Sequence, residues 1–237
     1  MATTQVSLSE DEEPGETPGA PRRRPWKVIA IVVAAAVVVA GVVWWVVARR
    51  ADPPSFVVQG TVQATVLSRD EASVVVGSSL AQGATASAPS AALSAEPDTC
   101  VIAVGPASES VYAREWTAFL STTYQDSAHT VTQVVGLYPG HDTAAAAFGR
   151  LEDGIGKCPS AVRKDPGRSS SWVYSVESSS ADALVWTAAQ DAADGWACYR
   201  QARLKGRVLF QVAVCEAGNG RTPAKQIADG ALARVAG

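Results

Sequence analysis

Four cysteines are the residues of this sequence most able to do chemistry, and they stand at positions 100, 158, 198 and 215. Thiolates can bind zinc, but zinc sites favour closely spaced pairs such as CxxC, and the sequence contains no such pair. The two histidines, His129 and His141, are not placed near any cysteine. We therefore expect no metal site, and the even number of cysteines favours disulfide bonds in an oxidising compartment.

The last two cysteines lie in what we expect to be a β-hairpin. Residues 196–204 and 208–216 are both strand-like, and the loop at Gly206 and Arg207 offers glycine at the first central position of a type II′ turn. In that register Cys198 faces Cys215 in a non-hydrogen-bonded pair, where side chains lie closest. We predict a Cys198–Cys215 disulfide, which leaves Cys100 and Cys158 to each other.

Catalytic motifs are missing from the sequence. It has no phosphate-binding glycine loop, no GxSxG nucleophile elbow and no kinase catalytic loop. Asp142 beside His141 fits a helix cap better than an acid–base pair, and the other carboxylates are scattered. We expect no enzyme, no cofactor and no metal, with a hydrolase as the remote alternative.

Aromatic side chains and arginines are the remaining candidates for binding. Most strand aromatics belong to a core, but a minority can line an apolar cleft where their polar tips orient a ligand. Arginines beside them, Arg203 included, would add charge. The candidate ligand-binding residues are Tyr112, Arg114, Trp172, Tyr174, Trp186, Tyr199 and Arg200.

The elements that must position these residues follow an apolar segment. Residues 28–47 read VIAIVVAAAVVVAGVVWWVV and carry no charge, so a helix there would span about 30 Å of bilayer. A cleaved signal peptide is the alternative, but it has a shorter apolar core and a small-residue cleavage site. We predict an uncleaved transmembrane helix at 26–48, a signal-anchor with tryptophans at both ends.

Charge sets the expected orientation in the cell membrane. Arg22, Arg23, Arg24 and Lys27 precede the apolar segment, and only two arginines follow it closely, so the N-terminus is expected to be cytoplasmic. The rest of the chain is nearly neutral, which argues against nucleic acid as a partner. We expect a disordered cytoplasmic tail at 1–25, a stalk at 49–61 and an extracytoplasmic domain at 62–237.

Periodicity within the extracytoplasmic part predicts a mixture of helices and strands. We expect strands at 129–137, 172–176 and 184–188, and helices at 69–77, 144–155 and 222–235. Asp142 or Thr143 would cap the second helix, and Thr222 would cap the last. Residues 56–68 fit either a strand or a helix start, and residues 78–97, rich in Ala and Ser, read as a surface loop.

These segments together resemble the PknH-like extracellular domain family over residues 62–236. The resemblance implies an α+β fold with an antiparallel sheet, packed helices and a ligand-size cleft. It implies the same two disulfide pairs and no catalysis. The residues that carry it are Leu67-Ser68-Arg69-Asp70-Glu71 with Gly77, Cys100, Val111-Tyr112, Cys158, Trp196-Ala197-Cys198-Tyr199-Arg200, Val212-Ala213-Val214-Cys215 and the terminal helix at 224–235.

Family members serve as the sensor module of a mycobacterial membrane kinase and also occur without a kinase in actinobacterial envelope proteins. Residues 1–25 are too few for a kinase domain, so we expect a kinase-free member. The expected function is non-catalytic, extracytoplasmic ligand binding of a sensor-like kind. Expected partners are the lipid bilayer and a small molecule, lipid or cell-wall ligand of the envelope. The alternative is a structural or assembly partner of a membrane protein such as a kinase or transporter.

Overall fold

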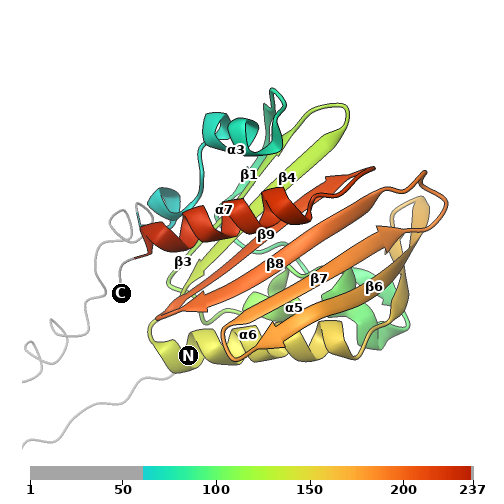
Figure 1. Cartoon of the computed structure of the whole chain (residues 1–237). Coiled ribbons are helices and arrows are strands. Elements are labelled where there is room, and N and C mark those ends of the chain that lie inside the picture. The colour runs from blue at the N-terminus through green and yellow to red at the C-terminus, as the bar shows by residue number, and fades with distance from the viewer. Residues whose placement is uncertain (1–60, 236–237) are drawn as a thin grey trace, which may run out of the picture. The chain divides into compact units, whose positions relative to one another are not determined.

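A nine-stranded antiparallel sheet is the framework of the structure, a computed structural model that describes residues 61–235 (Figure 1). The strand order is β1-β3-β4-β9-β8-β7-β6-β5-β2, so most sequential strands are neighbours. The strands are β1 (Ala81–Ala86), β2 (Ser94–Glu96), β3 (Ala118–Gln125), β4 (His129–Leu137), β5 (Ser160–Asp165), β6 (Arg168–Ser180), β7 (Ala183–Gln190), β8 (Ala197–Lys205) and β9 (Val208–Glu216). The α+β class and the antiparallel sheet are as predicted.

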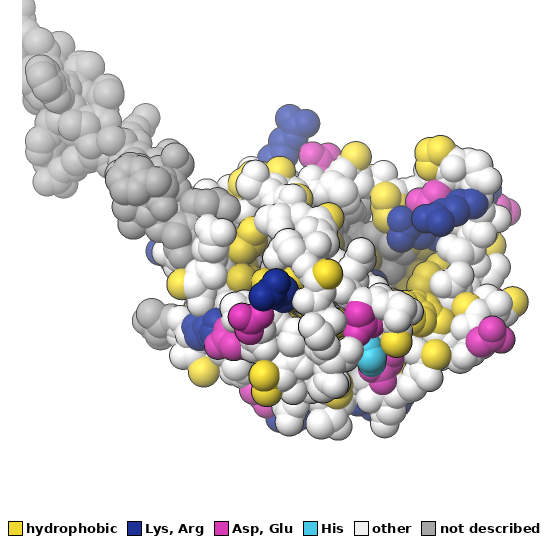
Figure 2. Space-filling model, turned by 90° about the horizontal axis from the view of Figure 1, so that it is seen from above, with side chains coloured by type: hydrophobic (Ala, Val, Ile, Leu, Met, Phe, Trp, Pro, Cys, Tyr) yellow, Lys and Arg dark blue, Asp and Glu magenta, His cyan; other side chains and the backbone are white. Residues whose placement is uncertain are grey.

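Helices cover both faces of the sheet. They are α3 (Arg69–Val76), α4 (Val101–Val104), α5 (Glu109–Tyr112), α6 (His141–Gly156) and α7 (Arg221–Arg234), with a 3-10 turn at Asp98–Cys100 and a helical stretch at 61–65. The apolar stripe of α6 packs into one hydrophobic core, and the buried face of α7 packs into a second core across the sheet (Figure 1). Seen from above, the unit is hollowed, and hydrophobic and basic side chains border the hollow (Figure 2).

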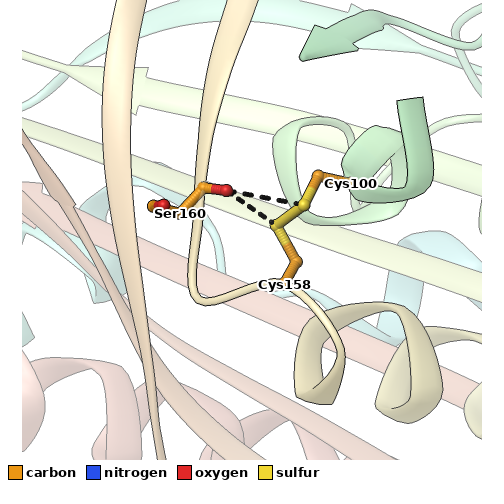
Figure 3. The surroundings of a disulfide bond; sticks show 3 residues. All are labelled: Cys100, Cys158 and Ser160. Atoms are coloured by element: carbon orange, nitrogen blue, oxygen red, sulfur yellow. Dashed lines mark hydrogen bonds between the residues drawn. A yellow bond between two sulfur atoms is a disulfide. The ribbon is translucent and has the colours of Figure 1, made fainter. Parts of the chain in front are cut away.

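The predicted hairpin and both disulfides are present. Cys198 pairs directly with Cys215 across β8 and β9, with their Cα atoms 3.9 Å apart. Gly206 has the positive φ, 55°, that the turn requires. The second bridge joins Cys100 to Cys158 just after α6, and both of its sulfur atoms lie 3.5 and 3.6 Å from the carbonyl oxygen of Ser160 (Figure 3). This bridge therefore fastens the 3-10 turn and α4 to the start of β5.

Two predicted helix caps are wrong. Helix α6 begins at His141 after Gly140, so Asp142 lies in its first turn, where a carboxylate favours the helix dipole without capping. Helix α7 begins at Arg221 after Gly220, which places Thr222 inside its first turn. Side-chain caps form instead at Ser68, whose hydroxyl accepts from the Glu71 N–H while Glu71 accepts from the Ser68 N–H, and at Ser108 before α5.

Residues 78–97 are not a loop throughout, because they contribute strands β1 and β2 at opposite edges of the sheet. An edge strand has one partner and keeps most side chains exposed, so main-chain hydrogen bonds hold it without an apolar alternation that sequence patterns reveal. Strand β6 likewise extends to Ser180, past the expected end at residue 176, through an irregularity between Val176 and Ser178.

The predicted tail, transmembrane helix and stalk, at 1–25, 26–48 and 49–61, lie outside the described residues except for residue 61. Within residues 61–235, no helix combines the length and the apolarity needed to cross a bilayer.

Gln133 of β4 fixes the segment before α3 to the sheet. Its side chain is fully buried; its Oε1 accepts from the Leu67 N–H at 2.9 Å and its Nε2 donates to the Leu67 carbonyl at 3.0 Å. The Tyr124 hydroxyl donates to the same carbonyl at 3.1 Å. The main chain of Leu67 therefore pairs with side chains of β3 and β4 instead of with another strand.

We predict that Gln133→Leu lowers the free energy of unfolding by about 1–3 kcal/mol, because the Leu67 N–H loses its acceptor in a buried site while the carbonyl keeps Tyr124. Denaturant titration with the disulfides intact measures this change. Gln125→Leu, at an exposed position at the end of β3, is the matched control and should stay within about 0.5 kcal/mol. Equal effects of the two substitutions would contradict the assignment.

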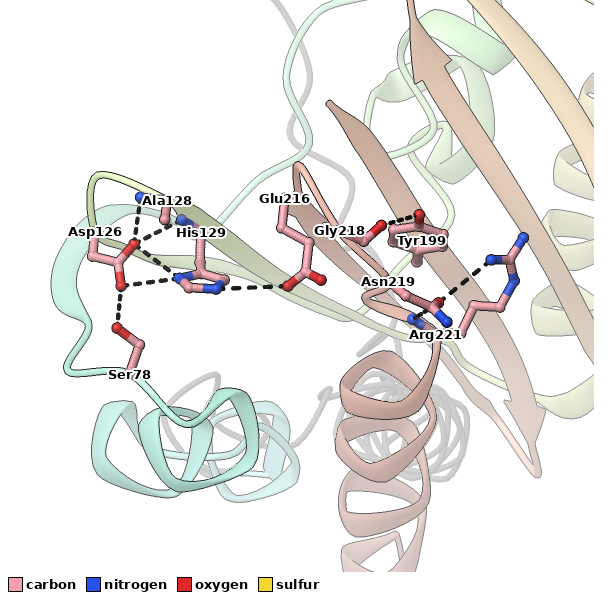
Figure 4. Close-up of polar contacts among 9 residues, drawn as sticks. All are labelled: Ser78, Asp126, Ala128, His129, Tyr199, Glu216, Gly218, Asn219 and Arg221. Atoms are coloured by element: carbon pink, nitrogen blue, oxygen red, sulfur yellow. Dashed lines mark hydrogen bonds and ion pairs between the residues drawn. The ribbon is translucent and has the colours of Figure 1, made fainter. Parts of the chain in front are cut away.

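The turn between β3 and β4 is organised by Asp126 (Figure 4). Its carboxylate accepts from the Ser78 hydroxyl at 2.5 Å and from the Ala128 and His129 N–H groups, both at 2.7 Å. The His129 ring lies 3.1 Å away. The hydrogen bond from Ser78, followed by that from Ala128, holds the pKa of Asp126 well below its usual range.

Because the folded-state pKa of Asp126 is depressed, its contribution to stability is present above the unfolded pKa of about 4 and is lost as the pH falls below it. We predict that Asp126→Asn is less stable than the parent at pH 7 and that the gap narrows at acid pH. Ser78→Ala, which removes one donor, should produce part of this change. Unfolding midpoints measured from pH 2 to pH 7 test the prediction, and parallel curves for parent and Asp126→Asn would refute it.

Candidate functional site

The structure divides the seven predicted ligand-binding residues among a core, a loop and the two faces of the sheet. Tyr112 is fully buried, packs edge-on against Phe119 at 5.0 Å, and its hydroxyl accepts from Gln211 Nε2 at 2.9 Å. Arg114 is exposed in the loop between α5 and β3. Tyr112 is therefore a core residue, and Arg114 does not join the others.

The remaining five residues lie on different faces of the sheet, because side chains alternate along each strand. Successive side chains of β8 point to opposite faces, so Tyr199 belongs to the core under α7, whereas Cys198 belongs to the core under α6. Arg200 shares the face of Cys198, and Trp186 of β7 pairs with it directly across the two strands. The sequence thus predicted as one site what the structure builds as two.

The first site is a groove of about 620 Å³ between α7 and strands β6 to β8, a volume in the range of small-molecule pockets. Tyr199 lies at its wall, where its hydroxyl donates to the Gly218 carbonyl and the Arg221 guanidinium lies 4.9 Å from the ring centre (Figure 4). The groove is lined by Glu177, Ser178, Val185, Trp186, Tyr199, Arg200, Gln201, Arg203, Arg221, Thr222, Ala224, Lys225 and Gln226. Trp186 and Arg200 border it where β7 and β8 run beneath it, but the strand pleat directs their side chains to the opposite face.

Charges around this groove are largely paired within the protein. Arg221 forms an ion pair with Glu177 at 2.8 Å, and Glu177 also accepts a hydrogen bond from Thr187. The contact with Arg221 is the main cause that lowers the pKa of Glu177. Lys225 pairs with Asp229 at 2.6 Å along α7. Arg203 donates to Gln201 Oε1, and burial lowers the pKa of its guanidinium. The groove offers an amphipathic wall with a polar rim rather than a single strong charge.

The second site is a cluster on the α6-facing side of β6, β7 and β8. Trp172 and Tyr174 occupy alternate positions of β6 and pack with Trp186 in the same core. Trp172 donates from Nε1 to Ser170 at 2.9 Å. Burial raises the pKa of Tyr174 to about 12 and lowers the pKa of Arg200 to about 10. Four of the seven predicted residues, Trp172, Tyr174, Trp186 and Arg200, therefore share one face.

The arrangement around His129 does not form a nucleophilic triad. His129 lies between Asp126 and Glu216, 3.1 and 3.7 Å away (Figure 4). Ser78 bonds to the Asp126 carboxylate, whereas activation of a serine requires its hydroxyl on the imidazole. In the described part of the chain, no group of three or more potential metal ligands converges.

Sequence reasoning missed several residues that line the groove. Glu177 of β6 and Arg221, Lys225 and Gln226 of α7 meet only because α7 crosses β8. The available signal was the spacing of Arg221 and Lys225, which places both on one side of a helix. That spacing alone does not say which strand the helix covers.

Comparisons with known proteins agree with this fold. The pattern of the PknH-like extracellular domain matches residues 57–234. The crystal structure of the extracellular domain of PknH from Mycobacterium tuberculosis is similar, with a TM-score of 0.66 and 23% identity over 73% of this chain and 93% of that chain. No curated protein matches the chain. With the family pattern matching most of its length, the chain belongs to the PknH-like extracellular domain family.

Proposed function

We propose that this protein is a non-catalytic, sensor-like binding domain held outside the cell membrane by one transmembrane helix. Membership in an extracellular domain family implies an extracytoplasmic C-terminal domain. The uncharged segment at 28–47 and the basic residues before it support the anchor and a cytoplasmic N-terminus. The ligand is a small molecule of the envelope that enters the groove beside α7.

The observation that carries the proposal is the groove itself. Its volume of about 620 Å³ accommodates a drug-sized molecule, and Val185, Tyr199 and Ala224 offer apolar surface beside polar groups at the rim. Because Arg221 and Lys225 are already ion-paired, recognition relies on shape, apolar contact and hydrogen bonds from Gln201 and Gln226. This composition suits binding and supplies no general acid, base or nucleophile in a relay.

Filling the groove tests the proposal. Gln226 is exposed on α7 and lines the groove, so Gln226→Trp blocks it without touching a core. We predict that the full chain, isolated from its native envelope in detergent, retains a small molecule detectable by mass spectrometry. The variant should retain at least about tenfold less, equivalent to about 1.4 kcal/mol of binding free energy.

Gln63→Trp is the matched control, since Gln63 is also an exposed helical glutamine but lies away from this groove. It should retain the ligand as the parent does. A parent chain that repeatedly carries no envelope molecule, or an equal loss in both variants, would refute binding in this groove. A stoichiometric membrane protein crosslinked in cells in place of a ligand would favour the assembly role instead.

A further inference from the structure

On the face opposite the groove, the structure places two hydrogen-bond donors without acceptors side by side. Arg200 and Trp186 are directly paired residues of β8 and β7, so their Cβ atoms lie about 5 Å apart on the same face. Arg200 Nε and Trp186 Nε1 are both buried, and neither has a hydrogen-bond partner within residues 61–235. Trp186 is 1% exposed. Buried donors are nearly always paired, so two adjacent exceptions indicate a missing acceptor.

The charge of Arg200 is also left uncompensated in the described part of the chain. The ionisable groups that act most on its guanidinium are the Tyr174 hydroxyl and the Arg163 guanidinium, and neither is a carboxylate. Arg163 is itself satisfied by Asp165 at 3.1 Å. Arg200 is half-buried with its Nε enclosed, and a partly desolvated cation without a counter-charge is costly, so a protein normally pairs it. Arg200 retains its proton because a guanidinium stays charged at any physiological pH.

The surroundings of Arg200 match an amphipathic ligand. Trp172, Tyr174 and Trp196 pack around the same core and present aromatic surface, and Trp172 and Trp196 are only half-buried. The cluster is therefore enclosed around Trp186 and reaches solvent at Arg200, Trp172 and Trp196, which are half-buried. A planar guanidinium beside aromatic rings suits an oxyanion attached to an apolar body, because the fork binds two oxygens and the rings cover the rest.

We propose that this cluster is a second ligand site, which binds the oxyanion of an amphipathic molecule through Arg200 and Trp186 and its apolar part against Trp172. The oxyanion is a carboxylate or a phosphate ester, two groups that share a bidentate geometry. The site is on the face away from α7, so this proposal does not depend on ligand binding in the groove. Arg200 acts as the anion-binding residue, and Trp186 Nε1 donates the second hydrogen bond.

The test titrates the full chain, in nanodiscs of zwitterionic phosphatidylcholine, with 2-naphthoate, 2-naphthyl phosphate and the uncharged 2-naphthalenemethanol. Calorimetry should show saturable binding of at least one anion, and Arg200→Gln should weaken it at least about tenfold. Arg207→Gln, an exposed arginine in the β8–β9 turn, is the charge-matched control and should bind as the parent does. Preference for carboxylate or phosphate identifies the source of the oxyanion.

Stability provides a readout that separates binding from a structural role. If Arg200 is held for a ligand, Arg200→Met removes an uncompensated charge, and its unfolding midpoint without ligand should be no lower than that of the parent. Gln226→Trp should leave anion binding unchanged, which keeps this site distinct from the groove. Equal affinity for the uncharged probe, equal loss in Arg207→Gln, or a clearly lower midpoint for Arg200→Met would overturn the proposal.

Discussion

The register of the β8–β9 hairpin is the constraint on which both sites depend. Side chains of a strand alternate between faces, so a slip of one residue would exchange the two faces along all of β8. The disulfide between Cys198 and Cys215 excludes such a slip, because the bridge forms only between directly facing residues. With the register fixed, Tyr199 is committed to the α7 side and Arg200 to the α6 side.

The two faces consequently differ in their electrostatic character. Under α7, Arg221 and Lys225 already have carboxylate partners, in Glu177 and Asp229. On the opposite face, Arg200 lies beside Trp186, and the ionisable groups that act most on it are Tyr174 and Arg163, neither of which is a carboxylate. A neutral or weakly polar molecule suits the first environment, and an anion suits the second. One strand thus supplies two chemically distinct surfaces from consecutive residues.

The sequence predicts the features that depend on neighbouring residues and misses those that depend on contacts between distant parts of the chain. The hairpin, the α6 stripe and the glycine stop of α3 depend on local chemistry, and all three are present. Strands β1 and β2 were not predicted, because exposed edge strands need no apolar pattern in the sequence. The candidate binding residues were chosen by residue type, and the alternation of side chains along each strand places them on different faces of the sheet. Composition alone does not reveal that division. Arg221 and Lys225 required knowledge of which strand α7 covers.

The origin of the two edge strands bears on how the domain matures. One early stretch of chain supplies both margins of the sheet, yet β1 must wait for β3 and β2 must wait for β5. Synthesis runs from the N-terminus, so these two strands are made before the strands with which they pair. Sheet completion is therefore a late, non-local event, and the first cysteine of the Cys100–Cys158 bridge likewise waits for the second. Both edge strands and this bridge therefore form only after later parts of the chain are present.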